Sequence, residues 1–147
     1  MPLGDSITDG YRRTPDSYRK NLYEHLTAAG LHVDFVGSGN RGTGVDNDNE
    51  GHSGWRIRDI QARIVDWMTA SDPDVVLLNI GTNDVGLVDD IPHAPARLST
   101  LIDTILAQSP TVQIVVAKVG VPPMKAVPGW TPRSPRVGWS GCSTVSS

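Results

Sequence analysis

The sequence predicts an α/β domain in which a parallel sheet lies between layers of helices. Two nearly continuous apolar segments, "DVVLLNIG" and "VQIVVAKV", are typical of strands that are covered on both faces. Amphipathic helical patterns separate these segments from each other and from the beginning of the chain. Because strands that alternate with helices of this length are joined by right-handed crossovers, we expect the strands to be parallel.

The first helix is expected to begin at Pro15 and to end before Gly30. Thr14 has the side chain of an N-cap, Pro15 suits the first helical position, and Gly30 suits a helix end. Between them an apolar stripe recurs every four residues, at Tyr18, Leu22 and Leu26. The segment "HVDFVG" then alternates in polarity, which predicts a short strand over residues 32–36.

A polar loop rich in glycine and asparagine is expected over residues 37–54, and two further amphipathic helices follow it. Ile57, Ile60, Ile64 and Trp67 mark the first of these helices, and Leu98, Leu101, Ile102 and Ile105 mark the second. The apolar segments quoted above supply the third and fourth strands. The expected order is therefore a short strand at the N-terminus and three helix–strand units.

Residues 1–119 are expected to form the folded core, and residues 120–147 an irregular tail rich in proline, glycine and serine. From Gly120 onward the chain has five prolines and no acidic residue, so neither helix nor strand is predicted there. We expect that a frame change or early stop near residue 119 has replaced the last strand and helix of a longer domain, with a natural short variant as the alternative. This loss would leave the fourth strand as an exposed sheet edge, which predicts a homodimer or an exchanged element.

Composition excludes several classes of function. The net charge of -3 comes from acids and bases that are mixed along the chain, which favours neither nucleic acid nor an anionic membrane as a partner. No apolar run is long enough to span a bilayer, and no signal peptide is evident. A single cysteine, Cys142, excludes an internal disulfide. We expect no cofactor.

The acidic stretch "DNDNEG" is similar to the beginning of a calcium-binding loop, with Asp46, Asp48 and Glu50 at alternate positions before Gly51. The closing ligand of such a loop would fall at Ile57, whose side chain cannot bind calcium. We therefore expect a solvated acidic turn and no metal, with calcium at Asp46 and Asp48 as the alternative.

Three segments that follow expected strands are predicted to meet at the carboxyl edge of the sheet. The first contains Ser6, which we interpret as a nucleophile, and Asp5, which we expect to brace its turn. The backbone N–H groups of Ser6 and Gly54 and the side-chain amide of Asn83 would supply an oxyanion hole. Taken singly, each of these segments is more typical of an ordinary turn.

Together the three segments resemble the SGNH, or GDSL, hydrolases. The family's first block matches "PLGDSITDG" with Ser6, its second matches "EGHSGW" with Gly54, and its third matches "GTND" with Asn83. The longer strings "SYRKNLYEHLTAAGLHVDFVGS" and "EGHSGWRIRDI" are similar to acetyl xylan esterases of carbohydrate esterase family 3. The resemblance implies a flavodoxin-like three-layer α/β/α sandwich, a secreted protein, and removal of acetyl groups from xylan through an acyl-enzyme.

The family's general base belongs to an Asp-x-x-His near the C-terminus, and residues 120–147 contain no histidine. A literal match occurs earlier, at Asp90-Ile91-Pro92-His93, where we favour a helix entry over a catalytic role. His52, in the second block, is the other candidate base. His25 and His32 carry no catalytic signal.

The leading hypothesis is an esterase acting on acetylated carbohydrate or a small ester, weakened by loss of its base. One alternative is a catalytically inactive remnant that binds carbohydrate through the "HSGW" loop and Trp55. A lipase or thioesterase of the same family is another, although the polar loop and low aromatic content do not favour a groove for a lipid acyl chain.

Overall fold

The computed structural model describes residues 1–11, 14–119 and 143–145 of the chain. A six-stranded sheet with the order β2-β3-β1-β4-β5-β6 forms its centre. The strands are β1 Pro2–Gly4, β2 Gly39–Asn40, β3 Asp48–Gly51, β4 Val75–Asn79, β5 Gln113–Val116 and β6 Ser143–Val145. The helices are α1 Ser6–Asp9, α2 Arg19–Ala28, α3 Ile57–Gln61, α4 Ile64–Ser71, α5 Thr82–Gly86, the 3-10 turn η1 Ile91–His93, and α6 Ala94–Gln108.

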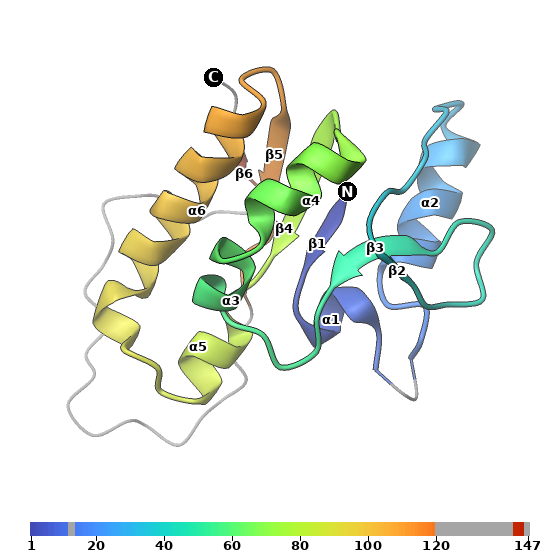
Figure 1. Ribbon diagram of the computed structural model, residues 1–147. Helices are drawn as coiled ribbons and strands as arrows, with labels where there is room; N and C mark the ends of the chain where they lie inside the picture. The colour runs from blue at the N-terminus through green and yellow to red at the C-terminus, as the bar shows by residue number, and fades with distance from the viewer. Residues whose placement is uncertain (12–13, 120–142, 146–147) are drawn as a thin grey trace.

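The four central strands, β3, β1, β4 and β5, are parallel, as predicted, and the two outer strands are antiparallel to their neighbours. Figure 1 shows α3, α4 and α6 together on one side of the sheet, and α2 apart from them beyond β1 and β3. The chain is thus an α/β sandwich in which helices lie on both sides of a mostly parallel sheet. In the part of the chain that the structure describes, no helix is long and apolar enough to cross a membrane.

The main hydrophobic core lies between the sheet and the helices α3, α4 and α6. Its members are fully or almost fully buried, among them Leu3, Ile60, Ile64, Val76, Leu78, Leu101, Ile105 and Ile114. Burial of one such aliphatic side chain stabilises the fold by roughly 1.5–3 kcal/mol. The opposite face is less complete, because the half-buried Val75 and Leu77 line an apolar groove beside α2.

The first helix begins later than the sequence predicts. Thr14 forms an isolated bridge with Tyr11, and α2 starts at Arg19. Ser17 has a φ of 55°, which interrupts any helix that begins at Pro15. The helix end is as expected, because Gly30 follows it with a φ of 81°.

The predicted strand over residues 32–36 is wrong, and the predicted loop over residues 37–54 contains two strands instead. The N–H of Phe35 donates to the carboxylate of Asp46 at 2.6 Å and not to a neighbouring strand. The strand beside β1 is β3, in which Asn49 and Glu50 are buried. Because the buried positions of β3 are polar, the strand has no apolar alternation by which it could be recognised.

The expected helix through Ile57 and Trp67 is divided in two. Its first part, α3, ends at Gln61, and α4 begins at Ile64 after one tight turn in which Arg63 N–H donates to the Ile60 carbonyl at 2.9 Å. The apolar stripe nevertheless faces the core, because the three isoleucines are all buried. Strands β4 and β5 and helix α6 lie where the sequence predicts them.

The C-terminal tail is described only at residues 143–145, so most of its predicted irregularity lies outside the described residues. Those three residues correct one expectation, since they form β6 and pair antiparallel with β5 from Val116↔Ser143 to Ile114↔Val145. A three-residue strand is too short to show a pattern in the sequence. The fourth expected strand, β5, is therefore not an exposed edge, and the homodimer stays a prediction without that support.

Candidate functional site

The strand register brings the three predicted segments to one edge of the sheet. Gly4, the last residue of β1, lies opposite Gly51 of β3 and Asn79 of β4. Ser6, Gly54 and Asn83 each follow within four residues of these strand ends. Figure 1 shows the result, with α1, α5 and the chain between β3 and α3 at the lower edge of the sheet.

The turn at Ser6 is organised by Asp5, which caps helix α1. The Asp5 carboxylate accepts a hydrogen bond from Ile7 N–H at 2.9 Å, and its backbone carbonyl accepts from Thr8 and Asp9 at 3.0 and 2.9 Å. Four N–H groups at the start of a helix lack i→i−4 partners, and three of the four at α1 have acceptors: Ile7 and Thr8 donate to Asp5, and Asp5 donates to the Asn79 carbonyl at 3.4 Å. The fourth belongs to partly exposed Ser6, whose N–H has no acceptor in the described part of the chain.

A second turn, residues 52–55, is attached directly to this one. His52 N–H donates to the carbonyl of Gly4 at 2.8 Å, and Trp55 N–H donates to the His52 carbonyl at 3.1 Å. Gly54 lies at the exposed tip of the turn with a φ of 83°, a backbone conformation that favours glycine. Among residues 1–11 and 14–119, no group accepts the Gly54 N–H.

Helix α5 supplies the third group of the site. The side-chain nitrogen of Asn83 donates to the carbonyl of Trp55 at 2.8 Å, which ties α5 to the 52–55 turn. An amide nitrogen carries two hydrogens, so a second donor remains. Buried Asp84 connects α5 to α3 and α6, because its carboxylate accepts hydrogen bonds from Ile57 N–H at 3.1 Å and from the Arg97 guanidinium at 3.2 Å.

Asp5 itself is fully buried beneath the nucleophile turn. Burial raises the pKa of Asp5, and the hydrogen bond from Ile7 N–H only partly opposes this effect. Gly4 before it is also required, because a Cβ at this position would lie 2.1 Å from the carbonyl oxygen of Asn79. The turn is thus built by close packing of β1 against β4, and the bracing role of Asp5 stays a prediction.

The imidazole of His52 contacts three neighbouring side chains. Its Nε2 lies 2.6 Å from the carboxylate of Glu50, and its ring stacks on Trp55 and Trp67 with centroid distances of 4.2 and 4.7 Å. Glu50 is only 1% exposed and also accepts hydrogen bonds from Ser38. In the part of the chain described, no hydrogen bond joins His52 to Ser6.

His93 lies at the entrance of α6, as the helix-entry interpretation predicts. Its Nδ1 is 2.7 Å from Asp90, but its side chain is 73% exposed. Figure 1 shows the N-terminal end of α6 beyond α3 and α5 as seen from α1. The Asp-x-x-His pattern therefore forms a local hydrogen bond that the structure does not bring to Ser6.

The acidic residues of the calcium alternative do not converge. Asp46 accepts from Phe35 and Asp48 N–H groups, Asp48 accepts from Asn40, and Glu50 faces His52 and Ser38. No group of three potential metal ligands is present among the residues that the structure describes. Each carboxylate is used in loop structure, so the calcium alternative gains no support.

Arg19 is a structural residue that sequence patterns do not reveal. Its guanidinium is 1% exposed and donates to the carbonyls of Thr8, Asp9 and Asn47 at 2.8, 3.1 and 2.7 Å, and also to those of Pro15 and Arg41. It thereby joins the end of α1 to the polar loop. A lone arginine beside an apolar stripe carries no signal of this role, and Glu50 was equally concealed within an acidic stretch.

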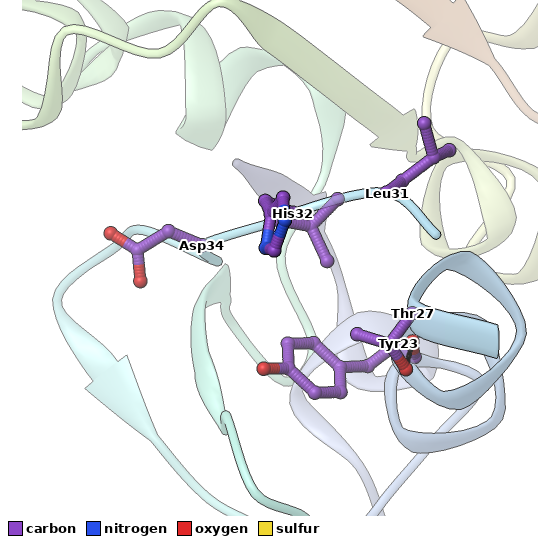
Figure 2. A pocket seen from close by; sticks show the side chains of 6 residues that line it. Tyr23, Thr27, Leu31, His32 and Asp34 are labelled. Atoms are coloured by element: carbon purple, nitrogen blue, oxygen red, sulfur yellow. Dashed lines mark hydrogen bonds between the residues drawn. The ribbon is translucent and has the colours of Figure 1, made fainter. Parts of the chain in front are cut away.

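A shallow cavity of about 240 Å³ lies beside α2 and away from this site. Figure 2 shows Tyr23, Thr27, Leu31, His32 and Asp34 around it, and Val33 completes the lining. None of the predicted site residues contributes to it. His32 is exposed there and offers a useful control position.

A serine at the carboxyl edge of a parallel sheet, with two backbone N–H groups that have no acceptor in the described part of the chain and an asparagine amide nearby, is an arrangement typical of hydrolases. The chain belongs to the GDSL-like lipase/acylhydrolase family, which matches residues 3–140. Among solved structures it is similar to a family 3 carbohydrate esterase of Clostridium thermocellum, with 44% identity, a TM-score of 0.75, and coverage of 81% of this chain and 60% of that one.

Two further relatives are related to the same class. An acetyl esterase, crystallised as a serine-to-alanine variant with an acetate ion, is 36% identical to this chain with a TM-score of 0.67. The match covers 81% of this chain and 60% of the acetyl esterase chain. A multidomain esterase of Ruminococcus flavefaciens is 32% identical over 135 residues, which are 76% of this chain and 17% of that protein. The chain thus spans 60% of the length of the two esterase structures and 17% of the length of the multidomain esterase.

Proposed function

We propose that the protein is a serine esterase that removes acetyl groups from acetylated carbohydrate through an acyl-enzyme on Ser6. The family membership supports ester hydrolysis, and the relatives described as carbohydrate and acetyl esterases support an acetylated carbohydrate as the substrate class. The carrying observation is the capping of α1, because Asp5 occupies three N–H groups and leaves that of Ser6 free.

In this mechanism Ser6 Oγ attacks the ester carbonyl carbon and its proton passes to a base. The N–H groups of Ser6 and Gly54 and the Asn83 amide donate to the oxyanion that forms. The carbon–oxygen bond to the sugar then breaks, the sugar oxygen takes a proton, and water later hydrolyses the acetyl-serine. A single such donor contributes about 10²–10³ in kcat in other hydrolases.

The proton acceptor is the missing component of this site. His52 is hydrogen-bonded to Glu50 and His93 to Asp90, and in the described part of the chain neither is hydrogen-bonded to Ser6. A site with an oxyanion hole but no base retains a residual 10³–10⁴-fold advantage over water, roughly, in enzymes whose triads have been removed. We therefore expect slow hydrolysis.

The test compares hydrolysis of p-nitrophenyl acetate by the wild-type chain, Ser6→Ala and Ser99→Ala. Ser99 is an exposed hydroxyl on α6 and serves as the matched control. We expect the wild type and the control to hydrolyse the ester faster than Ser6→Ala, which keeps only the residual rate that the oxyanion hole supplies, and we expect a fluorophosphonate to label Ser6. Equal rates in all three proteins would refute Ser6 as the nucleophile.

A second candidate function is carbohydrate binding without catalysis. The observation that favours it is the absence of a free histidine beside Ser6 in the described residues. It predicts no fluorophosphonate labelling but measurable heat of binding to acetylated xylan in a calorimeter. Acetate release from that polymer, with no release of a longer acyl chain from a hexanoyl ester, would instead favour the esterase over a lipase or thioesterase.

A further inference from the structure

The surroundings of His52 fix its side chain from three directions. Glu50 holds Nε2 at 2.6 Å, and Glu50 cannot turn away because the N–H and hydroxyl of Ser38 each hold its carboxylate at 2.8 Å. Trp55 and Trp67 stack with interplanar angles of 22° and 10°, so an indole lies close to parallel with the imidazole on each contact. Stacked aromatic pairs of this kind stabilise a structure by about 0.5–1.5 kcal/mol beyond the area they bury.

The backbone of the same residue builds the turn that presents Gly54. His52 N–H is bonded to the carbonyl of Gly4, two residues before Ser6, and its carbonyl accepts the N–H of Trp55. Gly54 is exposed, a Cβ at this position would meet nothing within 4 Å, and among the described residues its N–H has no acceptor. The orientation of its N–H therefore depends on the residues on either side.

We propose that His52 is a positioning residue whose imidazole, in contact with Glu50, Trp55 and Trp67, keeps the Gly54 N–H directed at the oxyanion. The role of the Gly54 N–H rests on the proposed function, whereas the control of the turn by His52 does not. The contacts of the imidazole come from β3, α4 and the turn itself, so the side chain joins β3 to helix α4.

A general-base role for His52 has different requirements. A ring nitrogen would have to reach Ser6 Oγ at about 3 Å, directly or through one water. Nε2 is already engaged by a buried carboxylate, and rotation of the ring would break both indole contacts. The observed geometry thus uses the imidazole as a packing and hydrogen-bonding unit.

The decisive experiment is hydrogen exchange followed by NMR in the full chain, with His52→Ala, His52→Gln and the control His32→Ala. We expect the Trp55 amide to exchange at least about tenfold faster in His52→Ala, and less so in His52→Gln, which keeps a donor for Glu50. The Ala117 amide, bonded to Leu78 in the sheet, reports global unfolding and should stay protected. Unchanged exchange at Trp55 would overturn the proposal.

If Ala117 loses protection in His52→Ala, the same comparison in His52→Gln decides the question. Where hydrolysis is measurable, we expect kcat to fall about 10- to 100-fold with KM unchanged, and His52→Gln to recover part of it. Complete loss of hydrolysis in His52→Gln without faster exchange of the Trp55 amide would contradict a positioning role and would identify His52 as the general base. Because exchange needs no catalysis, an inactive wild type would refute the proposed function alone.

Discussion

Two histidine–carboxylate pairs with nearly the same separation show how much the surroundings decide. His52 lies 2.6 Å from Glu50, and His93 lies 2.7 Å from Asp90. Glu50 is buried and the His52 side chain, stacked against two indoles, is 25% exposed, whereas the side chains of His93 and Asp90 are 73% and 55% exposed. The distance therefore does not distinguish a structural clamp from a solvated turn, but the burial does.

The electrostatics of the two carboxylates follow from this difference. Burial would raise the pKa of Glu50, but the hydrogen bonds from His52 and Ser38 outweigh it, so the pKa is lowered. The hydrogen bond from His93 lowers the pKa of exposed Asp90, which is also shared with Arg97. A buried acceptor has no water to replace a lost partner, and an exposed one has.

The largest expected loss of stability follows from removing the buried carboxylate of Glu50, with removal of exposed Asp90 as the comparison. Glu50→Ala leaves the half-buried donors of His52 and Ser38 without an acceptor, and we expect it to lower the free energy of unfolding by about 2 kcal/mol. Asp90→Ala should cost much less, because water replaces its contacts. Urea denaturation of both variants checks this, and equal losses would contradict the comparison.

The turn at Gly54 should be sensitive to backbone strain. An alanine at Gly54 must keep a φ near 83° without any steric clash, so we expect Gly54→Ala to cost about 1–2 kcal/mol. Gly86→Ala on α5 is the matched control, because it is exposed, helical and equally open. It should be neutral or stabilising by up to about 1 kcal/mol. Thermal unfolding of both variants measures the difference in stability, and because neither alanine meets a steric clash, a loss only in Gly54→Ala reports backbone strain.

Asp5 extends the burial argument to a carboxyl group whose pKa is raised by burial. Such a group contributes stability below its unfolded pKa, and this contribution is lost as pH rises through the folded pKa. We therefore expect the stability of wild type relative to Asp5→Asn to decrease as the pH rises above about 4, the ordinary pKa of an aspartate. Denaturant unfolding at several pH values measures this, with the exposed Asp103→Asn as control. A constant difference would contradict it.

The smallest expected effect belongs to His93. Its contact with Asp90 is solvated, so His93→Gln should change the free energy of unfolding by no more than about 0.5 kcal/mol. Hydrolysis of p-nitrophenyl acetate should also be unaffected, because the helix entry does not approach the nucleophile turn. A loss of activity without a loss of stability would show instead that His93 serves Ser6.

The parts of the fold that the sequence predicts correctly are those whose buried positions are apolar. Strands β4 and β5 and helix α6 carry clear apolar patterns, and the structure has them at the expected places. Strand β3 was missed because its buried Asn49 and Glu50 are satisfied by hydrogen bonds rather than by apolar packing. The later start of α2 depends on a positive φ at Ser17, which local preference does not favour.

By itself the sequence determined which residues are available for chemistry: a serine after a strand, a glycine and an asparagine in two later loops, and four histidines, none of them beyond residue 93. Only the tertiary structure decided which of these residues meet. The register of β1 with β3 and β4 brings Ser6, Gly54 and Asn83 to one edge of the sheet. The imidazole of His52 stacks against the two tryptophans. The physical reason is that local patterns record burial and turn preference, whereas contacts between distant side chains depend on packing.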